Sequence, residues 1–488
     1  MVIKCPLCHH KGRPVPVVSL RGFAEGATPL EYLASAYGSR TGYWKVQHAT
    51  AQSGYTAKLL AMMSHNLRVT EPECGAKAAG IPVDGADPEN IGTLLAQDAG
   101  AYKAGTPVTR AMLPELAGKT VQVRSPVTCQ AKAGLCQHCA GKLATGDFPE
   151  IGAYMGINSS AYVTNPMTQT LGLSIKHTGG IVSAQHRAIS GLPEIQQFWN
   201  VPERFQDAAV LATSDGKIDE IRKAAQGGWY VATGGEEHYV PAFRTLSVKA
   251  GDEVEAGDAL TDGTPNPKDV VKYKGIGEGR LYITNQFGQM LRDNGIGAPR
   301  RHVEILARAF TDRVRVNDPD SVAGYQVGDV VPYSSLERQY VPRAESRDQL
   351  PSAAMNQFLE RPVLHYTIGT RVTRRVAKAL QDAGVKHVLA NPSAPGFEPV
   401  VTRAMDVIAT DPDWETRLAG FNIHKSFLQA AQTGADSSAS APVSQTLCPG
   451  TRVRAPRTSS GTDGPARRQS SWSAVIAHGA VLWALRGL

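Results

Sequence analysis

The stretch TCQAKAGLCQHCAGK, residues 128–142, holds three cysteines: Cys129, Cys136 and Cys139. Thiolates bind zinc tightly, and a structural zinc site is closed by four ligands in a tetrahedron. The spacing therefore predicts a structural zinc site whose fourth ligand lies elsewhere in the chain. The alternative interpretation is a set of buried thiols without a metal.

Three candidates could complete this set. His138 lies between Cys136 and Cys139, where its side chain should point away from a metal held by its neighbours. The pair Cys5 and Cys8 would bring two ligands where one is needed. Cys74, in EPECGAK, supplies one cysteine followed by a glycine that favours a turn. On this arithmetic Cys74 is the best candidate.

Composition places the chain among ordinary globular proteins. Of its 488 residues, 42% are hydrophobic and 19% are charged. The sequence contains no run of eighteen apolar residues, and its start, MVIKCPLCHHKGRP, lacks the apolar core of a signal peptide. Seven cysteines in a chain of this size favour metal binding over a secreted disulfide framework. We therefore expect a cytoplasmic protein.

The formal net charge of +7 is concentrated at one end. Residues 437–488 contain six arginines, no lysine and one acidic residue, Asp463, so this tail carries +5 of the total. Net charge therefore says little about nucleic-acid binding by the body, and any basic groove must be local. The composition of the tail favours a disordered basic segment, with a translation artefact from a shifted reading frame as the second interpretation.

Helix-like and strand-like patterns of apolar residues alternate along the chain and are separated by turn residues. They predict an α+β, multidomain chain. In TPLEYLASAYGSR, Thr28 is a plausible helix N-cap and Pro29 a first helical residue, and a second helix should follow through VQHATAQSGYTAKLLAMMSHNL. VKAGDEVEAGDALTDG alternates short apolar runs with Gly-Asp turns, which predicts strands. The expected segments are 1–19 (a Cys/His-bearing lead), 20–70 (helical), 71–150 (zinc-binding), 151–200 (two helices around a Thr/Gly-rich middle), 201–310 (β-rich), 311–436 (mixed α/β) and 437–488 (the tail).

Five blocks in this order resemble a known family. Cys74-Gly, followed by VRSPVTCQAKAGLCQHCAGKLATG, is similar to the second zinc site of the beta-prime subunit of multisubunit DNA-directed RNA polymerases. The other similar blocks are GSRTGYWKVQHATAQSGYTAKLLA, EIGAYMGINSSAYVTNPMTQTLGLSIKHTGG, GLPEIQQFWNVPE, and VKAGDEVEAGDALTDGTPNPKDVVKYKG leading to RHVEILARAF. Together they span roughly 20–310. The resemblance implies zinc held structurally by Cys74, Cys129, Cys136 and Cys139.

The resemblance implies that about Thr28–His65 is the bridge helix, which in the family crosses the cleft beside the template base. Small residues at its centre would let a base approach closely, and Tyr55 could stack near the nucleic acid. Arg40 and Lys58 could reach phosphates. The alternative is an amphipathic core helix. The residues implied as nucleic-acid-binding are Arg40, Thr50, Ala51, Gly54, Tyr55 and Lys58.

The resemblance also implies a trigger loop over about 152–199, which in the family folds into a helical hairpin over the incoming nucleotide. His177 takes the place of the histidine near the triphosphate, where it would stabilise the β-phosphate or act as an acid. Leu173 takes the place of the residue that packs on the base, and Gln169 matches a glutamine near the sugar hydroxyls. The family's Glu-Pro-Gly is here Asn165-Pro166-Met167, and its arginine before the histidine falls at Ser174.

The family binds its catalytic Mg²⁺ through three aspartates in a DFDGD loop, and this sequence has no such motif. The resemblance therefore predicts the C-terminal part of a divergent, split beta-prime, and a phage or other mobile element as its source. The Mg²⁺ ligands would lie on a partner chain, and this chain alone should be inactive. The implied partners are the N-terminal beta-prime half, the beta subunit, template DNA, product RNA and nucleoside triphosphates, with no membrane.

Three further predictions concern an alternative function, the N-terminal cysteines and a small basic cluster. A non-catalytic zinc protein that binds nucleic acid or a polymerase is the alternative function, because it would explain the altered NPMTQ stretch and the missing arginine. CPLCHH, with Cys5 and Cys8, could bind zinc together with another chain, or be the remnant of a zinc ribbon. Arg300, Arg301 and His302 are interpreted as a basic cluster on the surface.

Overall fold

A computed structural model describes residues 9–10, 13–14, 24–76, 80–131, 133–173, 191–319, 322 and 324–411. All of them belong to a first unit, Met1–Ala439, that is separate from a second one, Ser440–Leu488. The predicted tail and the Cys5 and Cys8 pair lie outside the described residues. In the described part, no helix has the length and apolar character needed to cross a membrane.

Helix α1 (Pro29–Ser64) is the longest element of the described chain, with 36 residues. Thr28 is its N-cap, as predicted: the Thr28 hydroxyl accepts the Glu31 N–H at 3.3 Å, and Glu31 Oε2 accepts the Thr28 N–H at 2.8 Å. The prediction of two successive helices here was wrong, because the helix is continuous through GSRTG. Each glycine in a helix costs only about 1 kcal/mol relative to alanine, which is too little to end it.

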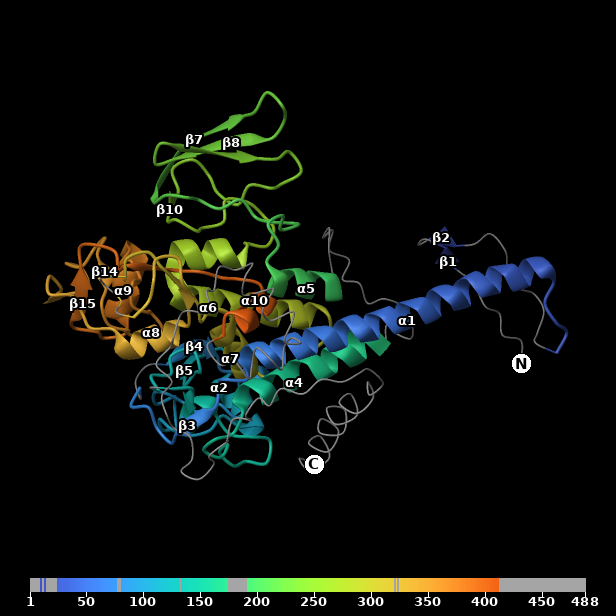
Figure 1. The fold of residues 1–488 in the computed structure, drawn as a ribbon, viewed down its shortest axis with the longest axis horizontal. Helices are drawn as coiled ribbons and strands as arrows, with labels where there is room; N and C mark the ends of the chain where they lie inside the picture. The colour runs from blue at the N-terminus through green and yellow to red at the C-terminus, as the bar shows by residue number, and fades with distance from the viewer. Residues whose placement is uncertain are drawn as a thin grey trace, which may run out of the picture. The chain divides into compact units, whose positions relative to one another are not determined.

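The C-terminal half of α1 runs beside α4 (Met155–Met167), as Figure 1 shows. The two backbones approach so closely at Gly156 that a Cβ there would lie 1.7 Å from the Ser64 carbonyl oxygen. Ser160 Oγ donates to the Ala57 carbonyl at 3.2 Å. From α5 (Leu192–Asn200), Gln196 Nε2 donates to Thr56 Oγ1 at 3.2 Å. One side of α1 is thus buried by two helices.

The described residues between 69 and 140 form a small module of short strands, with β3 parallel to β6 and β4 antiparallel to β5. Its own core is made by apolar side chains such as Ile81, Leu95, Leu116 and Val123. The module consists of β3 (Val69–Glu71), β4 (Ile81–Asp84), η1 (Pro88–Asn90), η2 (Arg110–Met112), α2 (Leu113–Leu116), β5 (Thr120–Val123), β6 (Leu135–Cys136) and α3 (Gln137–Ala140).

A four-stranded antiparallel sheet in the order β10-β7-β8-β9 follows α5. It encloses a separate small core that includes Ile218, Val231, Val240 and Leu260. Its strands are β7 (Gly216–Lys223), β8 (Trp229–Thr233), β9 (Glu236–Val240) and β10 (Glu253–Val254). The strands predicted in VKAGDEVEAGDALTDG are short, since only β10 and isolated bridges form there.

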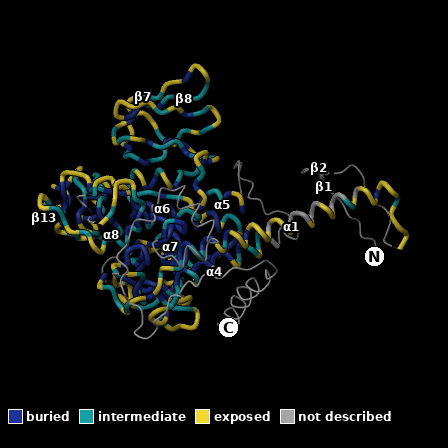
Figure 2. The backbone as a smooth tube through the Cα atoms, in the orientation of Figure 1, coloured by how far each residue is buried: buried dark blue, intermediate teal, exposed yellow. Residues whose placement is uncertain are grey.

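Helices occupy much of the second half of segment 201–310, for which the sequence predicted a β-rich region. Residues Pro267–Asp293 form α6, with a kink at Gly275, and Arg300–Phe310 form α7. The glycines in KGIGEG suggest a loop, but they serve packing: a Cβ at Gly277 would lie 2.1 Å from the His365 carbonyl oxygen. Figure 2 shows buried residues concentrated around α6 and α7, where Phe287 and Phe310 join the largest core.

The remaining described residues form two small sheets with helices. One sheet has the order β12-β11-β16 and the other β13-β15-β14. The elements are β11 (Val314–Val316), β12 (Val330–Val331), α8 (Tyr333–Gln339), β13 (Arg347–Gln349), β14 (Phe358–Leu359), α9 (Arg374–Asp382), β15 (Val388–Asn391), β16 (Phe397–Pro399) and α10 (Ala404–Ala409). Near the N-terminus, β1 (His9–His10) pairs antiparallel with β2 (Arg13–Pro14). The described chain is therefore a mixed α and β structure.

Candidate functional site

The structure brings together the four cysteines that the sequence predicted. The sulfur atoms of Cys74, Cys129, Cys136 and Cys139 all lie within 4.8 Å of one another, and the Cys74 and Cys139 sulfurs are 3.8 Å apart. Zn–S bonds of about 2.3 Å in a tetrahedron place sulfur atoms about 3.8 Å apart. The cluster therefore has the dimensions of a closed four-thiolate zinc site.

Local backbone geometry fixes three of these sulfurs. Cys136 ends β6 and is the N-cap of α3, so that its sulfur accepts the Cys139 N–H at 3.3 Å. The Cys136 N–H in turn points to Cys129 Sγ at 3.4 Å. Cys74 follows β3, which pairs with β6. Three of the cysteines are buried and Cys74 is half-buried, so the site is closed to an additional ligand.

A buried arginine lies against the cluster. Arg124 Nη2 donates to Cys139 Sγ at 3.2 Å and to Cys74 Sγ at 3.5 Å. Its guanidinium also contacts Glu73, with Nη2 to Oε1 at 2.7 Å and Nη1 to Oε2 at 3.2 Å. Four thiolates around one Zn²⁺ would leave a net charge of about −2, and a buried cation offsets part of it.

His138 is not a ligand of this cluster in the structure, as its position in the sequence predicted. Its Nδ1 lies 2.5 Å from Glu73 Oε2, and its ring contacts Phe148 edge to face. Burial alone would raise the pKa of the Glu73 carboxyl, but the hydrogen bonds from Arg124 and His138 outweigh burial and lower the pKa to about 2. Glu73 therefore stays ionised and holds Arg124 against the sulfurs.

The residues implied as nucleic-acid-binding share one exposed face of α1. Tyr55 is 50% exposed, and the space around Gly54 is open for at least 4 Å from a Cβ built there. Arg40, Thr50, Ala51 and Lys58 are exposed as well. The opposite face is buried by α4 and α5 through Ser53, Thr56, Leu60 and Met63, spaced as one stripe of a helix.

The region implied as a trigger loop is described only at its two ends. α4 continues directly into a π-helix, η3 (Thr168–Leu173), and α5 begins at Leu192. Gln169 lies in η3 and is exposed, and Leu173 is its last residue. His177 lies outside the described residues. Pro166 inside α4 lacks an N–H, which is compatible with the change from α- to π-helical hydrogen bonding here.

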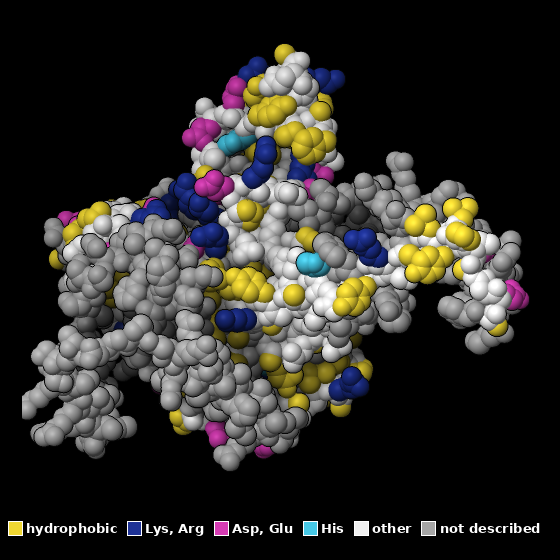
Figure 3. Space-filling model, turned by 45° about the vertical axis from the view of Figure 1, so that its right-hand side comes forward, with side chains coloured by type: hydrophobic (Ala, Val, Ile, Leu, Met, Phe, Trp, Pro, Cys, Tyr) yellow, Lys and Arg dark blue, Asp and Glu magenta, His cyan; other side chains and the backbone are white. Residues whose placement is uncertain are grey.

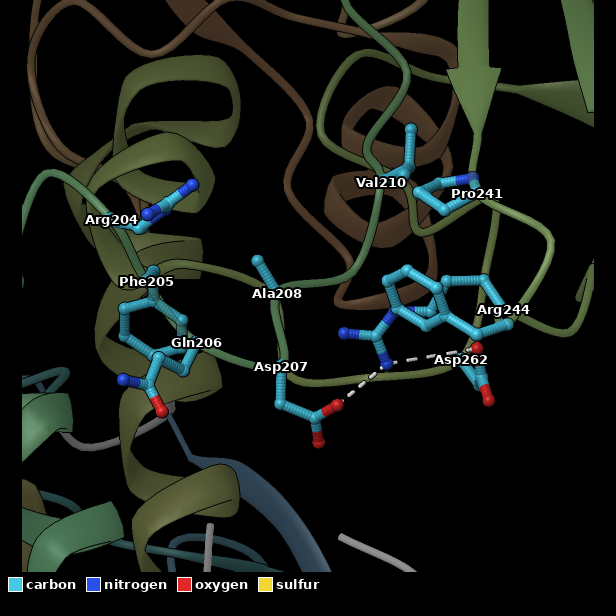
Figure 4. A pocket seen from close by; sticks show the side chains of 10 residues that line it. Arg204, Phe205, Gln206, Asp207, Ala208, Val210, Pro241, Arg244 and Asp262 are labelled. Carbon is cyan, nitrogen blue, oxygen red and sulfur yellow. Dashed lines mark ion pairs between the residues drawn. The ribbon is translucent and has the colours of Figure 1, made fainter. Parts of the chain in front are cut away.

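A depression of about 830 Å³ is lined mainly by residues 204–210 and 241–244, and none of the four cysteines lines it. Figure 4 shows Arg244 paired with Asp207 at 2.7 Å, with Asp262 at 4.0 Å on its other side. It contains none of the residues that the sequence analysis selected. Its lining contains two arginines, Arg204 and Arg244, and two aspartates, Asp207 and Asp262, so its formal charges balance.

Sequence reasoning missed the polar groups that support the cluster. Arg124 and Glu73 both stand in quoted motifs, VRSPVTC and EPECGAK, but their types alone do not assign a role. The signal that could have found Arg124 is a lone cation five residues before a predicted thiolate ligand, Cys129. The interpretation of Arg300, Arg301 and His302 as a surface cluster was wrong, since Arg301 and His302 are only 7% and 1% exposed.

Comparison with known proteins gives one consistent result. The chain is 30% identical over 331 residues to the "DNA-directed RNA polymerase subunit beta'" of Natranaerobius thermophilus, and this match covers 63% of the chain and 27% of the relative. It is 31% identical over 332 residues to the protein of that name from Moorella thermoacetica, covering 63% of the chain and 28% of the relative. The corresponding protein of Acetivibrio thermocellus is 30% identical over 332 residues. No family model matches the chain.

These matches cover little more than a quarter of each relative, so the chain spans about 27–28% of the length of the curated relatives it matches. The extent of the match is consistent with a C-terminal part of the subunit. It agrees with the resemblance carried by the cysteine motif and the four other blocks. Over 63% of its length, this chain is similar to the beta' subunit of DNA-directed RNA polymerase, as its motifs predicted.

Proposed function

We propose that this chain is a subunit of a multisubunit DNA-directed RNA polymerase, in which it supplies the bridge helix and the trigger loop for template-directed nucleotidyl transfer. The similarity to beta' subunits over 63% of the chain carries this proposal. The four-cysteine cluster, with a sulfur spacing suited to zinc, supports it. In the proposal zinc is structural, because four thiolates leave no open position for substrate.

The surface chemistry of α1 supports a place beside nucleic acid. Glu31 is the only acidic residue in the sequence of α1, and it is buried, while the sequence of α4 contains no charged residue. Figure 3 shows hydrophobic side chains and Lys or Arg along the N-terminal half of α1, with acidic side chains only near its tip. A face without acids does not repel phosphates, and Arg40 and Lys58 would attract them.

Small residues at the centre of α1 fit a close approach by a base. Ala51 and Gly54 keep side-chain bulk away from this face, and the open space around Gly54 would admit a planar ring. Tyr55, which is half exposed, offers a ring for stacking one position further along the helix. In the proposal these residues hold the template base, and Thr50 lines the same face.

Three residues would close on the incoming nucleotide. His177 would donate a hydrogen bond or a positive charge to the β-phosphate, Leu173 would pack on the base, and Gln169 would bind the sugar hydroxyls. Among the described residues, the four cysteines are the only group of three or more possible metal ligands. The carboxylates that bind catalytic Mg²⁺, which activates the attacking hydroxyl and neutralises phosphate charge, are therefore assigned to another polypeptide.

Affinity purification of the tagged chain from its native host, with mass spectrometry of the partners and a primed RNA-extension assay, tests the proposal. We expect a DFDGD-bearing subunit to co-purify and RNA to be extended. His177→Ala should then slow nucleotide addition by about 10²-fold, whereas the matched control His186→Ala in the same segment should not. A chain that purifies alone and extends no RNA contradicts the proposal.

A second candidate is a non-catalytic zinc protein that binds nucleic acid or a polymerase and retains the beta' scaffold. Two observations favour it: the sequence has no DFDGD motif, and Asn165-Pro166-Met167 replaces the family's Glu-Pro-Gly at the point where α4 becomes a π-helix. A chain that holds zinc and binds DNA, but neither extends RNA nor co-purifies with a DFDGD-bearing subunit, would establish this alternative.

A further inference from the structure

Helix α7 has three buried polar residues among its eleven residues. Arg301, His302 and Glu304 are 7%, 1% and 2% exposed. Burying such groups is costly unless each finds a partner, so their contacts show what the helix is built to hold. These contacts divide into two sets, one with the loops around the four cysteines and the other with α4.

On the cysteine side, α7 contacts the backbone of the ligand loop itself. Arg308 Nη1 donates to the Pro126 carbonyl at 2.7 Å and to the carbonyl of Cys129, one of the four cysteines, at 3.1 Å. Glu304 Oε2 accepts the Ser125 hydroxyl at 2.7 Å, and Ser125 Oγ accepts the Val127 N–H at 3.0 Å. The loop from Ser125 to Cys129 is thus fastened to two side chains of one helix.

Two further contacts strengthen this side. Arg301 Nη1 donates to the Ile91 carbonyl at 2.6 Å, and the next residue, Gly92, must be glycine because its φ is +87° and a Cβ would lie 2.8 Å from the Lys142 carbonyl oxygen. Ile305 packs in one hydrophobic cluster with Cys129, Cys136 and Cys139. Displacement of the cysteine loops would therefore break contacts from Arg301 to Arg308 of α7.

On the other side, His302 holds α4. Its Nδ1 lies 2.9 Å from Ser159 Oγ, and its ring stacks on Tyr162 at a centroid distance of 4.4 Å and an angle of 9°. Ser159 is completely buried. Since Ser159 and Tyr162 lie on adjacent turns of α4, one imidazole fixes both the rotation of that helix and its position along the axis.

We propose that α7 couples the four-cysteine site to α4, so that zinc bound by the cysteines also fixes the position of α4, with His302 as the positioning residue. Zinc orders the 125–129 loop, Arg308 and Glu304 transmit that order to α7, and His302 passes it to Ser159. The inference rests on the proposed zinc site but not on polymerase activity, so the two can fail independently. Met155, at the start of α4, also packs in the hydrophobic cluster that contains the cysteines. The test must therefore distinguish coupling through α7 from direct coupling through Met155.

Hydrogen–deuterium exchange of the full chain, zinc-loaded and chelator-treated, tests this coupling. We expect chelation to increase exchange in α4 about tenfold, while the β7–β9 sheet, which has its own core, changes little. Ser159→Ala should abolish most of this zinc dependence. The matched control is Ser160→Ala, which removes a neighbouring hydrogen bond of α4 directed at α1 instead of α7.

Thermodynamic reciprocity supplies a second readout, which is the affinity of the chain for zinc. If α4 and zinc are coupled through α7, Ser159→Ala should weaken zinc binding about fivefold in a chelator competition, and Ser160→Ala should leave it unchanged. His302→Asn, which keeps a hydrogen-bonding group near the Nδ1 position, should retain more coupling than His302→Leu. Equal effects of the two serine variants would overturn the proposal in favour of the route through Met155, and zinc-independent exchange in α4 would overturn coupling altogether.

Discussion

The four-cysteine cluster and the exposed face of α1 were both inferred from short motifs, yet the structure presents them very differently. The cysteines converge within 4.8 Å, with Arg124 and Glu73 completing their surroundings inside the same chain. The face of α1 that carries Tyr55 and Lys58 has no such surroundings among the described residues: its side chains are exposed. All the side chains that a structural metal site needs can lie within one chain and be seen in its structure. A face that binds a large ligand shows only exposed side chains until the ligand is present.

The largest expected effect comes from removing one cysteine. Cys136→Ser should reduce the zinc content from about one equivalent per chain to about zero and disorder the surrounding loops, because structural zinc contributes about 10 kcal/mol or more to folding such modules. Metal analysis and near-UV circular dichroism measure both results. Cys448→Ser, outside the cluster, is the control and should keep its zinc. A Cys136→Ser chain that retains zinc would contradict the site.

The two faces of α1 offer the next comparison. Leu60→Ala should lower the free energy of unfolding by about 2–5 kcal/mol, because the Leu60 side chain of α1 is fully buried in the largest core. Tyr55→Ala should change it by less than about 0.5 kcal/mol but reduce binding of template DNA in the purified complex. Urea denaturation and a DNA-binding titration measure the pair. Equal losses of stability would show that the exposed face of α1 is also a packing face.

A smaller effect should follow from acidification. Burial, together with the nearby Arg301 cation, lowers the pKa of His302 from its usual 6.5 to about 3. Since the unfolded chain then binds a proton that the folded chain rejects, stability should fall as the pH drops below about 6.5, by about 2 kcal/mol at pH 5. Urea denaturation at pH 8 and pH 5 measures this loss.

The control for acidification is His302→Asn, which cannot take up the proton. This variant should show a shallower pH dependence than the natural chain, even if it is less stable at pH 8. The same slope in both chains would place the pH dependence on other groups.

The smallest predicted effect is at the start of α1. Thr28→Ala removes the hydroxyl that caps the Glu31 N–H and should cost about 1 kcal/mol, confined to the first turns. Thr28→Ser keeps the hydroxyl and is the control. Hydrogen exchange of residues 29–34 measures the loss, and identical exchange in the two variants would show that the cap contributes nothing.

Short-range chemistry was predictable from the sequence. The Thr28 cap, the Cys74 assignment and the outward position of His138 all follow from residues within one motif or from ligand arithmetic, and the structure agrees with each. The similarity to beta' subunits confirms the family resemblance that the same motifs indicated.

Long-range packing was not predictable in this way. Arg301 and Glu304 look like surface charges because their partners, Ile91 and Ser125, lie about two hundred residues away in the sequence. The sequence analysis did not predict helix α6, in which Gly277 is needed where the helix backbone meets the carbonyl of His365. All three partners are distant in the sequence, so none of them can be identified before the chain is folded.

The contact between α1 and α4 has a consequence for genetic screens. At Gly156 even an alanine would collide with the Ser64 backbone, so every allele there should behave as a folding mutant, recessive and rescued by lower growth temperature or not at all. Gly54 lies on the same pair of helices but faces open space. If α1 lies beside nucleic acid as proposed, alleles of Gly54 should assemble normally and compete with the wild-type chain. Dominance would then distinguish a residue needed for packing from one proposed to face nucleic acid.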